Sequence, residues 1–150
     1  KSDSTTTNIA VGTNPYGVAA DATYVWVANG GSDNVTRIKK SDSTTTTIAV
    51  GTNPWGVAVD ETYVWVANGG SNNVTRIKKS DSTTTNIAVG TNPYGVAVDG
   101  TYCWVANVNS NNVTRITKAD LTTTTIAVGT GPNSLGDMAG YAYDNYSTKP

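Results

Sequence analysis

Aromatic residues that follow asparagine and proline recur along the chain and suggest a binding surface. The pattern returns every 39 residues and places the aromatic side chains at Tyr16, Trp55 and Tyr94. A flat aromatic ring offers apolar area to a ligand, and a neighbouring amide offers hydrogen bonds. The combination predicts contacts to a sugar or a peptide, with the amides supplied by Asn14, Asn53 and Asn92.

Residues suited to catalysis or metal binding are scarce in this sequence. The chain has no histidine and one cysteine, Cys103. Without histidine it can form no Ser-His-Asp triad, no imidazole acid–base pair and no histidine-containing zinc site. We therefore predict no catalytic residue, no metal site and no cofactor. Cys103 stands where Val25 and Val64 stand in the other repeats, which predicts a small buried side chain and not a reactive thiol.

Other repeated polar residues are predicted to hold the fold together. Carboxylates that end predicted strands should accept turn amides, and they are Asp21, Asp60 and Asp99. Guanidinium groups in the third predicted strand should pair with Asp or lie against Trp, and they are Arg37, Arg76 and Arg115. Asparagines that open a turn are attributed to their tolerance of left-handed backbone angles, and they are Asn29, Asn68 and Asn107.

The composition favours strands over helices. The 150 residues include 26 threonines and 16 asparagines, and charged residues make up only 14%, against about 25% in typical domains. Threonine favours strands and asparagine favours turns. The net charge of −1 gives no basic excess, and no apolar run approaches the roughly 18 residues of a membrane span. We therefore predict an all-β protein with neither nucleic-acid binding nor membrane insertion.

The repeat itself predicts the architecture. Within one 39-residue unit, four short runs rich in β-branched and aromatic residues cover 55–60, 62–68, 73–78 and 83–90. The connections between them are too short for crossover helices, so each unit should be a four-stranded antiparallel meander. The second run has no polar face, which indicates that both its sides are covered. Small residues in the first run should let backbones crowd near an axis. These features are typical of a β-propeller blade.

The motifs resemble a known repeat family. The strings PWGVAVD, TYVWVAN, SNNVTRI and TTTIAVG look like the YVTN-type β-propeller repeat of surface-layer and other secreted proteins, over about residues 1–130. They are also similar to the propeller of the virginiamycin B lyase family. The lyase resemblance implies catalytic histidines and a metal, and this sequence contains no histidine.

The unit boundaries predict an incomplete propeller of about three and a half blades. Residues 1–12 would be the outer strand of a preceding blade. Complete blades would cover 13–51, 52–90 and 91–129, and residues 130–150 would begin a further blade and form the tail. Propellers typically need at least about four blades. The chain is therefore expected to be a fragment of a longer propeller, a subunit completed by other copies, or a small ring closed by its own ends, and open blade edges should favour self-association.

Three functions remain open from the sequence. The first is a non-enzymatic extracellular propeller, secreted or on the cell surface, that serves as a binding or surface scaffold for a polysaccharide, glycoprotein or peptide. The second is a virginiamycin B lyase-like enzyme whose active-site residues are absent from this chain. The third is a structural propeller unit that assembles with itself and needs no ligand.

Overall fold

The structure is a computed structural model that describes residues 5–133 and contains only strands and connecting segments there. The first sheet comprises β1 (Pro15–Ala20), β2 (Tyr24–Asn29), β3 (Asn34–Lys39) and β4 (Thr45–Ala49). The second comprises β5 (Pro54–Val59), β6 (Tyr63–Asn68), β7 (Asn73–Lys78) and β8 (Thr84–Ala88). The third comprises β9 (Pro93–Val98), β10 (Tyr102–Asn107), β11 (Asn112–Thr117) and β12 (Thr123–Ala127).

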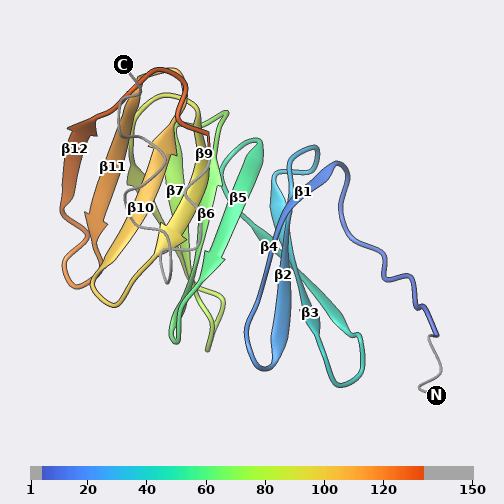
Figure 1. The fold of residues 1–150 in the computed structure, drawn as a ribbon. Helices are drawn as coiled ribbons and strands as arrows, with labels where there is room; N and C mark the ends of the chain where they lie inside the picture. The colour runs from blue at the N-terminus through green and yellow to red at the C-terminus, as the bar shows by residue number, and fades with distance from the viewer. Residues whose placement is uncertain (1–4, 134–150) are drawn as a thin grey trace.

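Each sheet is an antiparallel meander in chain order, and we call the three sheets blades 1, 2 and 3. Figure 1 shows them side by side. The prediction of an all-β protein built from four-stranded repeating blades is confirmed. No helix long and apolar enough to cross a membrane occurs in residues 5–133.

The inner strands β1, β5 and β9 lie against one another, and glycine makes this possible. A Cβ atom on Gly17 would collide with the carbonyl oxygen of Trp55 in the next blade, and one on Gly56 would collide with that of Tyr94. Only a residue without a side chain lets the two backbones approach this closely. The predicted crowding of small residues near the axis is therefore confirmed for these two glycines.

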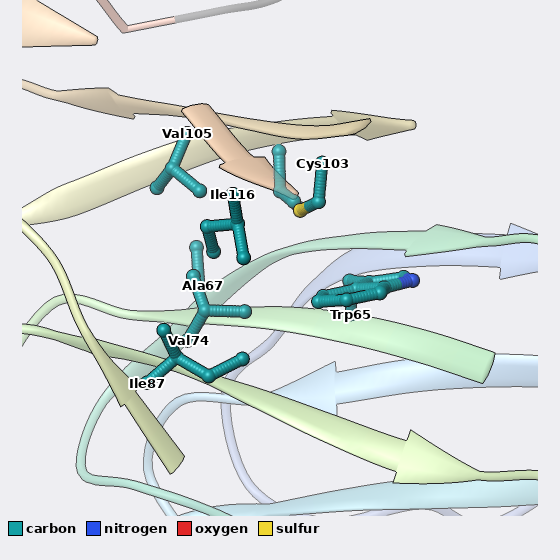
Figure 2. Close-up of a cluster of buried hydrophobic side chains, with 8 residues drawn as sticks. Trp65, Ala67, Val74, Ile87, Cys103, Val105 and Ile116 are labelled. Carbon is teal, nitrogen blue, oxygen red and sulfur yellow. The ribbon is translucent and has the colours of Figure 1, made fainter. Parts of the chain in front are cut away.

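The blades pack face to face through apolar seams. In the seam between blades 2 and 3, side chains from β6, β7 and β8 meet side chains from β10 and β11 (Figure 2). The buried residues of this seam are Trp65, Ala67, Val74, Ile87, Val96, Cys103, Val105 and Ile116. The seam between blades 1 and 2 buries Trp26, Val35, Ile48, Val64, Val66 and Ile77. Both sides of β6 are therefore covered, as its sequence predicts.

Two sequence-based expectations differ from the structure. Residues 5–12 form no strand. Their composition favours one, but each outer strand in this fold pairs with the third strand of its own blade, and residues 5–133 contain no such partner for residues 5–12. Residues 131–133 of the predicted further blade also form no strand, and the remainder of that predicted blade lies outside the described residues.

The prediction that left-handed backbone angles explain the asparagines after the second strand is wrong. Asn68 ends β6 fully buried, and the left-handed residue of this turn is Asn72. The Asn68 side chain donates hydrogen bonds to Asn73 Oδ1 and Thr75 Oγ1, both at 2.8 Å. Asn29 and Asn107 do the same in their blades. These side chains join the second and third strands, and hydrogen bonding explains them.

Candidate functional site: an aromatic stack along the inner strands

The three predicted aromatics each occupy the second position of an inner strand, inside a β-bulge. In blade 2, Pro54 pairs with Asn68 and the next regular pair is Val57 with Val66, so Trp55 and Gly56 lie outside the ladder. The same irregularity occurs in blades 1 and 3. A bulge bends the strand and redirects its side chain. Here it coincides with the aromatic position in all three blades.

The structure brings these aromatics into direct contact. The ring centroids of Tyr16 and Trp55 are 4.0 Å apart with an interplanar angle of 31°. Those of Trp55 and Tyr94 are 4.9 Å apart with an angle of 26°. We call the three residues the aromatic stack. The sequence predicts that they share a binding surface, and because the inner strands are so close, the rings touch and Trp55 lies between its neighbours.

Exposure differs along the stack. Tyr16 is 50% exposed and Tyr94 is 39% exposed, whereas Trp55 is half-buried. The Trp55 indole nitrogen Nε1 is buried and has no acceptor among the described residues. The free aromatic surface therefore belongs chiefly to the two tyrosines.

A groove of about 340 Å³ runs along the inner strands beside this stack. Each blade contributes an aromatic, a glycine and a valine, and the chain after β12 contributes Asn133. The lining residues carry no charged side chain. They are Tyr16, Gly17, Val18, Trp55, Gly56, Val57, Tyr94, Gly95, Val96 and Asn133.

The groove collects most of the exposed apolar side chains of the described chain. Among residues 5–133, five large apolar residues are exposed. Three of the five line the groove, and they are Tyr16, Val18 and Tyr94. Val18 alone is 65% exposed. Exposed apolar surface that gathers in one place is a common mark of a binding site.

The predicted asparagines adjoin the stack but do not line the groove. Asn14, Asn53 and Asn92 have positive φ values of 49°, 52° and 53°, and Gly131 takes the equivalent place at 64°. Asparagine and glycine tolerate this left-handed conformation best. The backbone N–H of Asn53 donates to Asp33 Oδ1 at 2.8 Å, which ties blade 2 to the turn of blade 1. Backbone geometry therefore accounts for asparagine at these positions.

A second, larger hollow lies at the opposite end of the inner strands. It measures about 580 Å³ and is lined in part by Asp21, Asp60, Glu61 and Lys79. Asp60 Oδ1 accepts the backbone N–H groups of Thr62 at 2.9 Å and Tyr63 at 2.8 Å. Asp60 Oδ2 accepts the Trp65 indole at 3.0 Å and pairs with Lys118 at 3.1 Å. Both oxygens are occupied by partners within the fold.

The pKa values of these aspartates agree with that role. Burial alone would raise the pKa of Asp21, but hydrogen bonds from the backbone N–H groups of Tyr24 and Thr23 outweigh it and lower the pKa to about 2. The same opposition, with the hydrogen bonds prevailing, lowers the pKa of Asp60 and Asp99. Carboxylates held in the charged form by turn amides are structural, as the sequence predicts.

The arginines and the cysteine also have structural roles, since they pack against other side chains of the fold. The guanidinium carbon of Arg76 lies 4.3 Å from the ring centroid of Tyr63 and 5.9 Å from that of Trp65. The predicted contact with tryptophan is present, but the tyrosine is nearer. Cys103 is fully buried, and burial raises the pKa of its thiol well above the usual value. Residues 5–133 contain no group of three or more His, Cys, Asp or Glu side chains that could hold a metal ion.

The repeated four-stranded blades, packed face to face with their inner strands together, define the chain as part of a β-propeller, and solved structures agree. A streptogramin B lyase structure superposes with a TM-score of 0.75 at 18% identity, over 85% of this chain and 46% of that one. Hydrazine synthase of Kuenenia stuttgartiensis gives 0.75 at 20% identity, over 89% of this chain and 42% of that one. A nidogen/laminin complex gives 0.68 at 17% identity, over 80% of this chain and 51% of that one.

These likenesses concern the fold alone, since their identities are low. The chain spans about half or less of the length of these three structures. No family model and no curated protein matches the sequence.

Two features of the groove are not among the residues predicted from the sequence. Asn133 lies 39 residues after Tyr94, so the repeat spacing could have added it to the lining. Gly17, Gly56 and Gly95 also line it, and the Gly that follows each aromatic in the sequence was the available signal. The same glycines were also a signal for the bulge, because an isolated glycine inside a strand often marks one.

Proposed function

We propose that this chain is a non-enzymatic binding module that takes a neutral glycan along the groove of the inner strands. The observation that carries the proposal is the gathering of exposed apolar surface in that groove, where Tyr16, Val18 and Tyr94 are exposed beside uncharged neighbours. Sugar rings present apolar C–H faces and hydroxyl groups, so they suit a surface of aromatic rings with polar atoms nearby.

The arrangement favours an extended neutral ligand over a charged one. The same lining recurs in three neighbouring blades, which suits a polymer whose own units repeat. The outer faces of Tyr16 and Tyr94 offer ring surface, because Trp55 occupies the space between them. Asn14, which is exposed, and Asn53 and Asn92, which are half-buried, stay in the proposal as amides at the edge of the groove.

The resemblance of the repeat to YVTN-type propellers supports an extracellular placement. Secretion or display at the cell surface is therefore part of the proposal. Antibody detection of the native protein in the medium or on intact cells is the expected result, and detection only inside cells would contradict it.

A glycan array probed with the full chain tests the ligand class. For a glycan that binds, calorimetric titration should show a dissociation constant about tenfold or more higher for Tyr16→Ala and for Tyr94→Ala, as expected for central anchors of a binding surface. Thr84→Ala is the control, since Thr84 is exposed on β8 and lies outside the groove. A chain that binds peptides and no glycan, or variants that bind as well as the parent, would overturn the proposal.

A further inference from the structure

The two seams between blades are built from the same repeat positions. We call the side of a blade that faces the following blade its trailing face, and the opposite side its leading face. In the first seam, the trailing face of blade 1 supplies Trp26, Val35 and Ile48. The leading face of blade 2 supplies Val64, Val66 and Ile77. The second seam repeats this arrangement 39 residues later, with cysteine in place of one valine.

The same positions occur twice more without a described partner. The leading face of blade 1 carries Val18, Val25, Val27 and Ile38, and the trailing face of blade 3 carries Trp104, Val113, Ile126 and Val128. Exposure shows that both faces are incompletely covered. Val18 is 65% exposed, whereas its counterpart Val96 is 9% exposed. Ile126 is 37% exposed, whereas its counterpart Ile87 is 7% exposed.

The ion pairs between blades also repeat from one seam to the next. Each seam contains one ion pair in which the later blade gives the lysine and the earlier blade gives the aspartate. These pairs are Lys79 with Asp21 at 3.2 Å and Lys118 with Asp60 at 3.1 Å. The equivalent residues on the two outermost faces are Lys40, on the leading face of blade 1, and Asp99, on the trailing face of blade 3. Neither has an oppositely charged side chain within 4.0 Å among residues 5–133.

We propose that two copies of this 150-residue chain dock head to tail, with the trailing face of blade 3 of one copy against the leading face of blade 1 of the other. The contact reproduces the seam already formed twice within the chain, so its shape and charge are complementary by construction. Lys40 of one copy pairs with Asp99 of the other, and Tyr16 extends the aromatic stack from Tyr94. The contact shares Tyr16, Val18 and Tyr94 with the glycan groove, so docking covers part of the surface that the glycan would occupy, and the two events compete for it.

A second copy fits better than the rest of this chain. In each blade the isoleucine of the leading face lies on the third strand and the lysine directly follows that strand, whereas residues 134–150 align only with the first two strands of a blade. Two copies also suit the known fold, because one chain aligns with 46% and 42% of two solved propeller structures. Two head-to-tail contacts then close a ring, which leaves neither face bare.

Sedimentation velocity of the full chain over a wide concentration range tests the proposal. A dimer is expected at the higher concentrations. Lys40→Glu places a carboxylate opposite Asp99, and the dissociation constant should rise about tenfold or more. Lys78→Glu is the matched control, because Lys78 pairs with Asp81 on an exposed turn at 3.3 Å and should leave the dimer unchanged. Circular dichroism confirms that each variant is folded.

Mixing two variants tests the head-to-tail arrangement itself. Lys40→Glu damages the leading face and Ile126→Asp damages the trailing face, and each alone weakens both contacts of the ring. In a mixture, an undamaged leading face meets an undamaged trailing face, so association should exceed that of either variant alone. A chain that stays monomeric, a dimer insensitive to both variants, a mixture without recovery, or open polymers in place of a dimer would each overturn the proposal.

Discussion

Trp55 and Trp65 stand on neighbouring strands of blade 2, yet they meet opposite environments. Trp65 is fully buried in a seam, and its indole donates to Asp60 Oδ2 at 3.0 Å. Trp55 is half-buried beside the axis groove, touches Tyr16 and Tyr94, and has no acceptor for its indole nitrogen among the described residues.

The difference shows which parts of a repeat the fold determines. The tryptophan position on the second strand is the same in all three blades, at Trp26, Trp65 and Trp104, because the seam requires that shape and the aspartate requires that donor. The aromatic position on the inner strand alternates between tyrosine and tryptophan. Packing beside the axis requires an aromatic ring of no fixed size, which leaves this position available for function.

The seam gives the largest expected effect. Trp65→Ala should lower the free energy of unfolding by about 3–5 kcal/mol, because it leaves a cavity and removes the partner of Asp60. Urea unfolding followed by circular dichroism measures the change. A loss below about 1 kcal/mol would show that the seam does not hold the blades together.

The aspartate that anchors Trp65 gives the next effect. Asp60→Asn should cost about 1.5–3 kcal/mol at neutral pH, since charge-assisted hydrogen bonds to the turn and the indole are lost. Glu61→Gln is the control, because the exposed Glu61 accepts no hydrogen bond from the described residues. Chemical unfolding of both variants beside the parent measures the difference, and equal losses would contradict the anchor role.

The same aspartates predict how stability changes with pH. The pKa values of Asp21, Asp60 and Asp99 are lower in the folded chain than their usual value of about 3.9. The unfolded chain therefore binds more protons in acid, so their contribution is full above about pH 4 and is lost as the pH falls toward about 2, the folded pKa of Asp21. Thermal unfolding from pH 7 to pH 2 should show this decline, and Asp60→Asn should flatten it.

The packing of the inner strands can be tested at the glycines that let neighbouring backbones approach closely. Gly56→Ala should cost about 1–3 kcal/mol, because the new methyl group would collide with the Tyr94 carbonyl and force the inner strands apart. Gly100→Ala is the matched control, since a Cβ there meets nothing within 4 Å. If the two variants unfold at the same urea concentration, the inner strands are less crowded than the structure shows.

Much of the fold was predictable because three copies of the repeat reinforce one another. The third predicted strand, 73–78, matches β7, and the others differ from β5, β6 and β8 by a few residues at their ends. The apolar pattern of β6 gave its burial on both sides. Residues 5–12 show the limit, since the same strand-forming composition gives no strand where no neighbour is available.

The sequence predicts which aromatic residues form the candidate site but not how they are arranged. The spacing identified Tyr16, Trp55 and Tyr94, but their stacking depends on the distance between inner strands and on a bulge, which arise from pairing between segments. The sequence predicts a ligand contact at the neighbouring Asn53, and its left-handed backbone is a second reason for asparagine at that position. Residue type alone cannot distinguish an amide chosen for its side chain from one chosen for its φ angle.

Trp55→Tyr gives the smallest expected effect on stability, and Trp55→Ala gives the sharpest contrast with Trp65. Trp55→Ala removes two ring contacts at the groove, each worth about 0.5–1.5 kcal/mol beyond its area, so its cost should remain below that of Trp65→Ala in the same urea experiment. Trp55→Tyr should cost less still, because tyrosine fills the equivalent place in blades 1 and 3 and the indole N–H without an acceptor is removed. If Trp55→Tyr destabilises the chain as much as Trp65→Ala, Trp55 belongs to the core, and the inner-strand aromatics lose their freedom to serve a ligand.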